Sequence, residues 1–593
     1  MTRMLDTTLQ AAFIPGTNCT GGLACAPWRF LLPTMRFERA LILGLPGLST
    51  MQVLTTLCPE VTVIAGAAVC HKRSEAALDS LRGSRLQVLE PAQFPALSLP
   101  EGRVDLIVLA GRRSMQQALQ HPALLDALGR CLAPHGTIYF ESHDYRQRLT
   151  ARRLLTKLQQ QGLHVTRQFW LTPFGGDWRT AFPLGEAAMA RFVFANLLYG
   201  QSPLKRLVSR VGTALSQSAH FFRLLPRRAV LVGRNGSDAA SQAPPRFLLE
   251  LASQQGVDLS RYRCGVSARG RYNSNKTIFF LFAEQSSRPE LIIKMTRAPE
   301  FNFRLENEQR MLLRLQEQRS VPPDTFPEPV FFGHHAGLAI CCQRAVHGVP
   351  FRSRTHGTSA CPFARQAIDW LVQVAAGSAP ENRVAATAPA AVLQTLFERF
   401  TGLYQLSPAE RDFLQKQIAR VAASRRPFPS VLQHGDPGTW NMLVSAQGRV
   451  SVIDWEAGEV QGMPLWDLFY FMRSYGNWMA RRQGLRDALQ GFRSMLLAAS
   501  PLSALLAQTV ARYCAVTSLD RALVGPLFFT CWLHRALKEA SRLTPATLAE
   551  GHYYRLLKLC IAQRQAPGLA ALLTVQPPDH RAAVHASPPL PQV

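Results

Sequence analysis

The sequence predicts two domains, an α/β domain with a parallel sheet followed by a larger domain of mixed α and β structure. From residue 37 to about 233, short apolar runs alternate with amphipathic stretches, which is the pattern of a parallel sheet covered by helices. A segment rich in Ser, Ala, Pro and Gly follows at residues 235–246, as expected of a linker. A second strand and helix pattern then begins, and it becomes mainly helical after about residue 364.

Hydrophobic periodicity places the individual elements. In the first domain, helices separate the strands, and a basic, partly helical insertion precedes the last strand. The predicted strands lie at residues 39–46, 61–69, 104–111, 136–142, 229–236, 276–284, 290–295 and 337–344, and a helix lies at 307–318. We expect a poorly ordered N-terminus, two domains joined by the linker, and a disordered tail. In chain order, the N-terminus is residues 1–36, the first domain 37–234, the linker 235–246, the second domain 247–572 and the tail 573–593.

The composition narrows the classes of partner. The chain has 593 residues and a formal net charge of +27, of which residues 1–244 carry +13 and residues 245–593 carry +14. This charge is spread without a dense basic block, so we expect no sequence-specific nucleic acid partner. Diffuse basicity suits anionic partners and disfavours a strongly cationic substrate, although a solvated Arg-rich surface explains it as well.

Cysteine usage and hydropathy indicate the compartment. The twelve cysteines form no CxxC pair and no Cys/His cluster, so we expect no disulfide framework or zinc site, and a reducing cytosol. The N-terminus lacks the basic and apolar pattern of a signal peptide. The most apolar stretch, residues 494–511, contains Pro501 and is expected to be buried helix. We therefore predict a cytoplasmic protein without a transmembrane segment.

Residues 431–456 carry the most specific signal in the chain. In HGDPGTWN four residues separate Asp436 from Asn441, and an apolar hairpin then leads to Asp454. Acidic residues in apolar runs are costly to bury unless they are paired, often with a metal. One carboxylate here could orient a hydroxyl and accept its proton, while an amide oxygen and a second carboxylate hold magnesium. The alternative is that these residues and His434 only cap a turn and end a strand.

The motifs HGDPGTWNMLV, VIDWE and PLWDLFYF resemble those of the aminoglycoside phosphotransferase and choline kinase group, over residues 245–565. The resemblance implies a bilobal, protein-kinase-like α+β fold, ATP or GTP and Mg²⁺ as cofactors, and a small-molecule or sugar acceptor. It implies Asp436 as catalytic base, Asn441 and Asp454 as magnesium ligands, and Asp467 as a structural acid. We expect Trp440 to pack under the loop instead of stacking on a substrate.

The same resemblance requires a strand lysine that pairs with a glutamate on the next helix. The segment ELIIKM offers Lys294, and LENEQRMLLRL offers Glu306 and Glu308. Glu308 is preferred because three apolar residues follow it at helical spacing, which places it near the inward face. Lys294 would then hold the nucleotide phosphates, although a surface strand lysine is the alternative.

Two backbone segments complete the expected nucleotide site. The segment CGVSARGRYNSNKTIFF could turn over the phosphates, with Gly265 and Gly270 allowing close approach of the backbone, although it is not a GxGxxG motif. The segment CCQRAVHGVP resembles the hinge between the lobes. There, the backbone groups of Arg344 and Ala345 would meet the adenine.

The segments FERALILGLPGLS, VDLIVLAG and LLDALGRCLAPHGTIYFES resemble a class I methyltransferase scaffold over residues 37–234. This implies a Rossmann-like parallel sheet, with Gly44 and Gly47 approaching S-adenosylmethionine. The family's loop usually reads G-x-G-x-G, but Pro46 and Leu48 occupy two of its glycine positions here, and no acid ends the second strand. These departures predict a degenerate domain that does not bind S-adenosylmethionine.

Three functions remain open at this point. The leading one is nucleotide- and magnesium-dependent phosphotransfer to a hydroxyl. The others are a bifunctional methyltransferase–kinase that modifies a glycan or metabolite, and a non-catalytic protein that senses nucleotide. An aminoglycoside acceptor would need a local acidic pocket, to which Glu456, Glu459 and Asp467 could contribute, although the charge of the C-terminal half counts against it.

Overall fold

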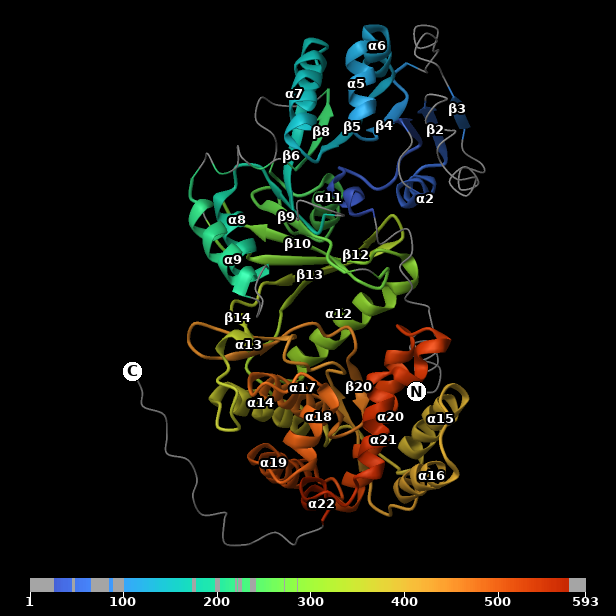
Figure 1. The fold of residues 1–593 in the computed structure, drawn as a ribbon, viewed down its shortest axis with the longest axis vertical. Coiled ribbons are helices and arrows are strands. Elements are labelled where there is room, and N and C mark those ends of the chain that lie inside the picture. The colour runs from blue at the N-terminus through green and yellow to red at the C-terminus, as the bar shows by residue number, and fades with distance from the viewer. Residues whose placement is uncertain are drawn as a thin grey trace. The chain divides into compact units, whose positions relative to one another are not determined.

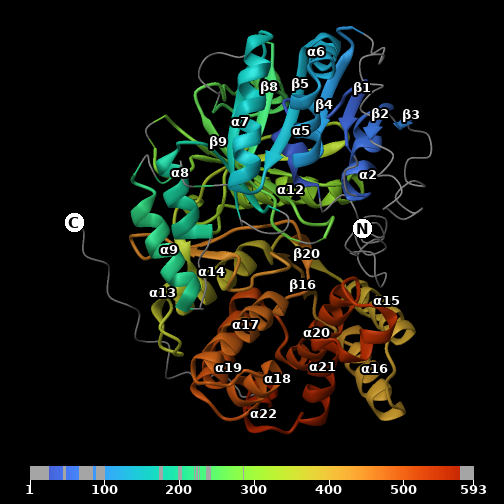
Figure 2. The ribbon, with the colours of Figure 1, turned by 45° about the horizontal axis from the view of Figure 1, so that its top comes forward.

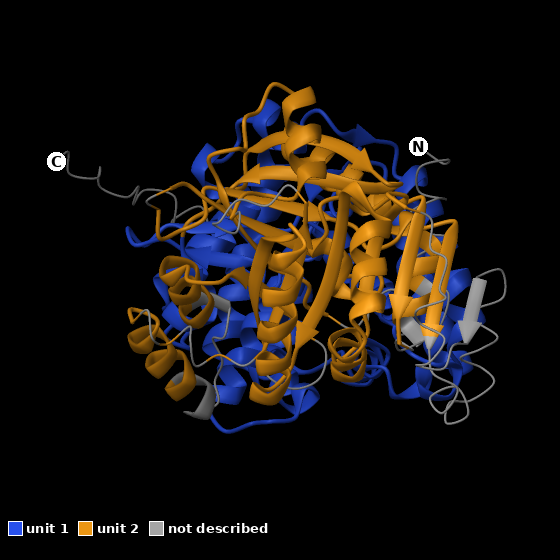
Figure 3. Ribbon diagram, turned by 90° about the horizontal axis from the view of Figure 1, so that it is seen from above, with its two compact units in different colours: residues 1–17, 314–325, 348–593 blue, residues 18–313, 326–347 orange. Residues whose placement is uncertain are grey.

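A computed structural model describes most of the chain. The described residues are 26–44, 48–65, 85–88, 101–172, 178–197, 203–218, 221, 225, 227–234, 242–270, 272–284 and 286–574. Two compact units are present (Figure 3): unit 1 comprises residues 1–17, 314–325 and 348–593, and unit 2 comprises residues 18–313 and 326–347. Unit 2 thus extends across the expected linker, of which residues 235–241 lie outside the described residues, as do residues 575–593 of the expected tail.

Unit 2 is built on one mixed sheet of thirteen strands, in the order β12-β13-β11-β10-β9-β7-β6-β8-β5-β4-β1-β2-β3. The strands are β1 (Arg39–Leu43), β2 (Glu60–Ala65), β3 (Arg85–Val88), β4 (Val104–Leu109), β5 (Leu132–Ser142), β6 (His164–Thr172), β7 (Thr180–Pro183), β8 (Arg228–Gly233), β9 (Arg263–Ser267), β10 (Thr277–Phe282), β11 (Leu291–Met295), β12 (Pro329–His335) and β13 (Leu338–Arg344). Its helices are α2 (Leu48–Leu57), α5 (Arg112–Gln120), α6 (Pro122–Cys131), α7 (Tyr145–Gln160), α8 (Ala187–Phe192), α9 (Pro203–Leu215) and α11 (Arg246–Gln254).

The N-terminal part of this sheet is largely parallel. Strands β3, β2, β1, β4 and β5 pair in parallel, and β8 lies antiparallel between β5 and β6. Buried apolar residues of α5–α7 pack on one face against the inward side chains of these strands, and Figure 2 shows α5 and α7 side by side across them. Apolar strands covered by amphipathic helices are what the alternating pattern of residues 39–142 predicts.

A short pairing joins the two parts of the sheet. In β7 and β9, Thr180 lies opposite Ser267 and Ala181 lies opposite Val266, in antiparallel register. Strands β9–β11 and β13 then continue antiparallel toward the edge strand β12. One buried apolar cluster includes residues on both sides of this junction. The sheet and its core therefore bridge the two expected domains inside unit 2.

Residues 26–36, which were expected to be poorly ordered, belong to this core. Pro27–Leu31 form a 3-10 helix in which every side chain is buried. The Arg29 guanidinium donates a hydrogen bond to the carbonyl oxygen of Arg297 at 2.6 Å. The expectation failed because aromatic and aliphatic residues in a short segment without periodicity can still bury apolar surface.

Unit 1 is mainly helical (Figure 1). Its helices are α13 (Phe351–Arg354), α14 (Pro362–Ser378), α15 (Thr387–Leu403), α16 (Pro408–Ala422), α17 (Trp466–Arg482), α18 (Ala488–Phe492), α19 (Pro501–Thr517), α20 (Val524–Ala540), α21 (His552–Ala562) and α22 (Pro567–Leu573), and α12 (Asn302–Gln318) ends in it. Its short strands are β14 (Val349–Pro350), β15 (Arg383–Val384), β16 (Phe428–Pro429), β17 (Val431–Gln433), β18 (Met442–Val444), β19 (Val450–Val452) and β20 (Glu459–Gly462). The pairs β17–β20 and β18–β19 frame residues 431–456.

Among the described residues, no single helix combines the length and the apolar character that a membrane crossing requires. Two helical segments, Ala488–Leu497 and Pro501–Thr517, meet those conditions only when they are taken together, and a bend of 62° separates them. This stretch contains the most apolar run of the sequence.

Candidate active site

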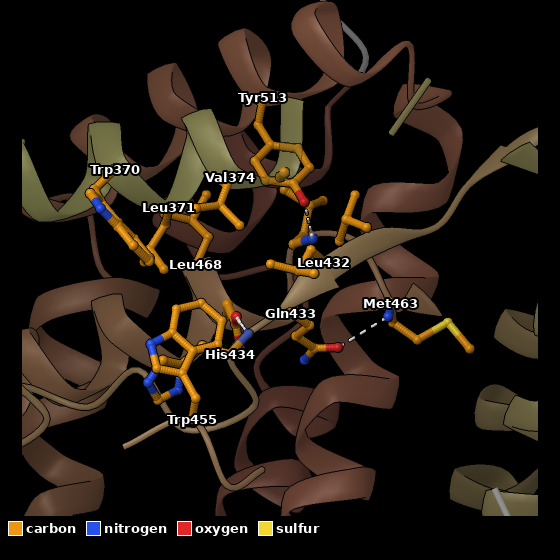
Figure 4. Close-up of a pocket in the computed structure, with 14 residues that line it drawn as sticks. Trp370, Leu371, Val374, Leu432, Gln433, His434, Trp455, Met463, Leu468 and Tyr513 are labelled. Atoms are coloured by element: carbon orange, nitrogen blue, oxygen red, sulfur yellow. Dashed lines mark hydrogen bonds between the residues drawn. The ribbon is translucent and has the colours of Figure 1, made fainter. Parts of the chain in front are cut away.

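The loop between β17 and β18 is held in place by a buried histidine. His434 donates from Nε2 to the carbonyl oxygen of Ile453 at 3.0 Å, and its Nδ1 accepts the N–H of Asp436 at 3.1 Å. Its ring lies against Trp455, with 4.6 Å between the ring centroids, as Figure 4 shows. Both ring nitrogens are thus used, and the imidazole serves to position the backbone of Asp436.

Glycine is required at the next position. Gly435 has a φ of +77°, and a Cβ there would lie 1.9 Å from the carbonyl oxygen of Ala457. Asp467, at the start of α17, accepts the N–H groups of His434 and Gly435 at 2.5 and 3.0 Å. Burial raises the pKa of Asp467, and the nearby His434 and these donors oppose that shift. Asp467 thus braces the loop as an acceptor of its backbone.

A small, largely apolar pocket borders this loop and β17 (Figure 4). Within it, Gln433 accepts the N–H of Met463 at 3.1 Å, and the Tyr513 hydroxyl accepts the N–H of Leu465 at 3.1 Å. These bonds satisfy buried backbone donors where the chain enters α17. The pocket therefore belongs to the support of the loop.

The structure brings Asp436 and Asn441 together. Asn441 Nδ2 donates to the main-chain oxygen of Asp436 at 2.9 Å and to its Oδ2 at 3.2 Å. The carbonyl oxygen of Asn441 accepts the N–H of Ile453 at 2.9 Å, which ties the loop to the segment before Asp454. Asp454 has a φ of +73°, an uncommon conformation for a residue with a side chain. Such strain persists where the surroundings impose it, often at functional sites.

Asn441 and Asp454 carry oxygen donors of the type that suits magnesium. Because the side-chain nitrogen of Asn441 donates to Asp436, its side-chain oxygen Oδ1 faces away from Asp436 and is available as a ligand atom. The carboxylate of Asp454 adds a second hard oxygen donor, the type that Mg²⁺ prefers. Across the described residues, no group of three or more His, Cys, Asp or Glu side chains could hold a metal. A magnesium ion here would therefore need the Asn441 oxygen together with carboxylate oxygens.

Two further side chains contact Asp436. Arg535 of α20 has its Nη1 3.8 Å from Asp436 Oδ1, and its guanidinium lies 3.4 Å from the ring centroid of Tyr470. Trp440 donates from Nε1 to Asp436 Oδ2 at 3.3 Å and is 40% exposed, so the expectation that it packs under the loop is wrong. Arg535 was not among the predicted site residues. The available signal was a charged residue inside the apolar helical run FFTCWLHRALKEA, where an unpaired charge is costly.

In unit 2 the structure brings Lys294 and Glu308 together. Lys294 lies on β11 and forms an ion pair with Glu308 of α12. Both side chains are buried, and Lys276 adds a second amine 3.9 Å from the other carboxylate oxygen of Glu308. Glu306, the alternative partner, lies 3.3 Å from His334 at the surface. Lys276 was missed because a lysine at the start of a strand carries no distinctive pattern.

The predicted glycine turn is only partly present. Gly270 lies in a loop with a φ of +101°, and its carbonyl oxygen accepts from Arg297 at 3.1 Å. Gly265 instead lies within β9, where a Cβ would be 2.6 Å from the ring of Phe182. Its glycine is explained by the close approach of β7, because this aromatic side chain leaves no room for a methyl group.

The predicted hinge donors are already used inside unit 2. The N–H of Arg344 donates to the carbonyl oxygen of Glu328, and that of Ala345 donates to Glu290, both at 2.8 Å. These amides therefore cannot also donate to an adenine. Only the N–H groups of these two residues are thereby excluded as adenine contacts, and the strand predicted at residues 337–344 agrees with β13.

The N-terminal turn after β1 is filled by protein. Gly44 has a φ of +90°, and its N–H donates to Ile64 at 2.7 Å. A Cβ there would lie 2.2 Å from the hydroxyl of Ser114, which itself donates to Ala110 at 3.1 Å. Gly47, the second predicted glycine, lies outside the described residues. The close backbone approach at Gly44 thus accommodates Ser114.

Comparison with known families identifies a domain that spans parts of both units. Residues 267–497 match the family described as the phosphotransferase enzyme family, APH. The match includes the Lys294–Glu308 pair, the loop at 434–441 and Asp454, and it covers less than half of the chain. No curated protein sequence matches significantly. The chain therefore contains a segment that matches a phosphotransferase family.

Several solved structures share low overall similarity. The type VIII aminoglycoside-3'-phosphotransferase is 15% identical, with a TM-score of 0.27, and the alignment covers 43% of this chain and 88% of that one. For APH(3'')-Id from Streptomyces rimosus the values are 16%, 0.28, 49% and 97%. For WbdD bound to a kinase inhibitor they are 13%, 0.21, 82% and 87%. With TM-scores this low, these likenesses carry no argument about the present chain.

Proposed function

We propose that this chain transfers the γ-phosphoryl group of ATP or GTP, with magnesium, to a hydroxyl of a small molecule or sugar. The observation that carries the proposal is the set Asp436, Asn441 and Asp454. It lies within the segment that matches a phosphotransferase family, and hydrogen bonds join its loop to the strand before Asp454. A solvated turn would not need this interlocked arrangement, nor a strained backbone at Asp454.

Asp436 is the proposed catalytic base. Its side chain is about one-third exposed, so a hydroxyl can reach it, while Asn441 and Trp440 orient its carboxylate through Oδ2. It would align the acceptor hydroxyl and take its proton as the new bond to phosphorus forms. His434 is unsuited to that role because both of its nitrogens are engaged.

Lys294 is the proposed phosphate-binding cation. The carboxylate of Glu308 is fully buried and fixes the amine in one place, which favours electrostatic stabilisation that needs no reorganisation. Asn441 and Asp454 would hold magnesium, which when bound neutralises charge on the phosphates.

The N-terminal part of unit 2 is proposed to be a methyltransferase-like scaffold without that activity. What supports the scaffold is the order β3-β2-β1-β4-β5 of its parallel strands, since ligands in such sheets bind where the order reverses, here between β1 and β4. What opposes activity is Gly44, whose neighbouring space holds Ser114. The described residues of this turn therefore offer no support for the bifunctional alternative.

The test is magnesium-dependent turnover of ATP and GTP by the full-length protein against sugars, amino alcohols, nucleosides, aminoglycosides and glycan fragments. Asp436→Asn is measured in parallel, because it keeps the shape of the side chain and removes the base. Turnover with one acceptor that disappears in this variant supports the proposal. Equal turnover by both proteins would exclude Asp436 as the base. Bound nucleotide without turnover would favour the nucleotide-sensing alternative.

A further inference from the structure

Basic and aromatic side chains gather around Asp436 in unit 1. They come from the catalytic loop and from helices α17, α20 and α21. We refer to them as the basic-aromatic cluster, which consists of Trp440, Tyr470, Arg473, Arg535, Lys538 and Tyr553. Their ring contacts are continuous: 6.0 Å separates the ring centroids of Trp440 and Tyr470, and 6.2 Å separates those of Tyr470 and Tyr553. The proposed reaction has so far used only Asp436 at the edge of this cluster.

Arg535 is buried and has hydrogen-bonding capacity to spare. Its side chain is 6% exposed, and its contacts are the stacking on Tyr470 and the long ion pair with Asp436. Within the described part of the chain, its guanidinium makes no hydrogen bond. A guanidinium carries five N–H donors, and buried polar groups in folded proteins are nearly always hydrogen-bonded. The donors of Arg535 are therefore suited to a bound molecule.

A second arginine lies along the same row of rings. Arg473 lies 4.8 Å from the ring centroid of Tyr553 and hydrogen-bonds His552 through one terminal nitrogen. Its Nε is buried without a hydrogen-bond partner among the described residues. Burial and the charge of Arg473 lower the pKa of His552 to about 3, so this histidine is a neutral acceptor. The positive charge in this row comes from the arginines.

The acidic residues nearby do not offset this charge with free carboxylates. Asp467 uses both of its carboxylate oxygens on backbone N–H groups of the loop. Glu539 accepts the N–H of Tyr553 at 2.9 Å. Glu459 is partly buried, and burial raises its pKa while Lys538 opposes that change. Of the three residues that could contribute to an acidic pocket for an aminoglycoside, Asp467 is therefore engaged by the loop backbone.

We propose that the acceptor is a hydroxylated anion, such as a sugar with a carboxylate or phosphate group, and that Arg535 binds this group while the hydroxyl faces Asp436. This inference rests on the proposed phosphotransfer and adds the charge of the acceptor to it. Trp440, which is 40% exposed, offers a flat apolar face to the sugar ring beside the base.

The energetics favour an anion over a cation at this place. Arginine binds carboxylate and phosphate through two parallel hydrogen bonds, which are stronger than bonds between neutral groups. A cationic acceptor would instead place a like charge beside Arg535, and such a juxtaposition is a common way to exclude a partner. Lys538, three residues further along α20, adds a positive charge on the same side of the helix.

The test compares acceptors that share one ring and differ in charge: glucose, glucosamine, glucuronate and glucose 6-phosphate. With the full-length protein we expect kcat/KM at least about tenfold higher for an acidic member than for glucose, and lowest for glucosamine. Arg535→Gln should lower kcat/KM for the acidic acceptor by about 10- to 100-fold more than it lowers kcat/KM for glucose. The kcat/KM of Arg535→Lys for the acidic acceptor should lie between those of the wild type and Arg535→Gln. Arg542 is an exposed arginine past the end of α20, and Arg542→Gln should behave as wild type.

Preference for glucose or glucosamine would overturn the inference and leave the phosphotransfer proposal standing. If none of the four is phosphorylated, calorimetric titration of the nucleotide-free protein with glucuronate and with inorganic phosphate decides. Saturable binding that Arg535→Gln abolishes supports the inference, whereas no binding, or binding that persists in Arg535→Gln, overturns it. Should Arg535→Gln fail to fold, Lys538→Gln replaces it with the same expectations. The preference of the wild-type protein among the four acceptors can be measured without any variant. If no acceptor of the wider panel is phosphorylated, that result would count against the proposed phosphotransfer and not against the proposed charge of the acceptor.

Discussion

Gly435 and Gly44 both have positive φ angles, +77° and +90°, but their surroundings differ. At Gly435 the close neighbour is the main chain at Ala457, and the turn holds Asp436 at a partly exposed position. At Gly44 the close neighbour is the hydroxyl of Ser114, which occupies the space beside the turn. One glycine therefore helps to expose a reactive side chain, and the other allows a protein side chain to pack.

Polar residues near Gly435 and polar residues in the N-terminal part of unit 2 also differ in what they contact. Around residues 434–454, the predicted polar side chains contact one another through Asp436, Asn441 and the backbone before Asp454. After β5, the acid Asp144 caps α7 by accepting the N–H of Gln147 at 2.7 Å, which is a structural role. Mutual contact between the predicted residues distinguishes the candidate site better than the presence of a turn.

The largest expected effect separates Asp454 from Asp144. Asp454→Ala should lower phosphotransfer by about 10³-fold or more, because it removes a proposed metal ligand, with little change in melting temperature. Asp144→Ala should leave kcat unchanged and lower the free energy of unfolding by about 1 kcal/mol through loss of a helix cap. Steady-state kinetics and urea denaturation of both variants measure this. Substantial turnover by Asp454→Ala would remove this residue from the proposed site.

A second contrast lies within α12. Glu308→Gln should lower the free energy of unfolding by about 3 kcal/mol, because it leaves buried lysine charge without its partner, and should raise the KM for nucleotide. Glu306→Gln should change stability by less than about 0.5 kcal/mol, since its contact with His334 is exposed. Urea denaturation and nucleotide kinetics compare the two. Equal effects would argue against a special role for the buried pair.

The glycines themselves provide a third contrast. Gly435→Ala should lower the free energy of unfolding by about 2–3 kcal/mol, because its Cβ meets a main-chain carbonyl in a left-handed conformation. Gly44→Ala should cost about 1–2 kcal/mol, because the hydroxyl of Ser114 can rotate away. Activity should fall only in Gly435→Ala. Loss of activity in Gly44→Ala with the fold intact would instead assign that turn a part in the reaction.

The smallest expected effect is an absence of binding. With the full-length protein, ATP and magnesium should raise the melting temperature, because a ligand that binds the folded state stabilises it. S-adenosylmethionine at the same concentration should not change it. A saturable shift with S-adenosylmethionine would contradict the proposed degeneracy of the N-terminal region and revive the bifunctional alternative.

Short motifs predicted which of these residues lie together because the residues are near neighbours in the sequence or on one helix. Asp436 contacts Asn441 as their spacing suggests, and helical periodicity favoured Glu308 over Glu306 as the partner of Lys294. Arg535 lies about a hundred residues from Asp436 in the sequence, and only packing of α20 brings them together. Trp440 was misjudged for a related reason, because its exposure depends on which helices cover the loop.

Parts of the fold were beyond the reach of periodicity for similar reasons. Strands β1, β4 and β10 follow from apolar runs in the sequence. Strand β7 has only four residues, and its role depends on a partner, β9, that lies beyond the expected linker. Apolar runs also do not show that hydrogen bonds within unit 2 use the N–H groups of Arg344 and Ala345.

The junction between β7 and β9 has a consequence for how the chain is dissected and how it evolved. Cutting the chain at residues 235–246 would leave both strands with an unpaired edge, and exposed edges promote aggregation. A truncated N-terminal fragment that precipitates would therefore say nothing about the activity of either part. Because one sheet continues through this pairing, neither part can be removed or exchanged without leaving an unpaired strand on the other.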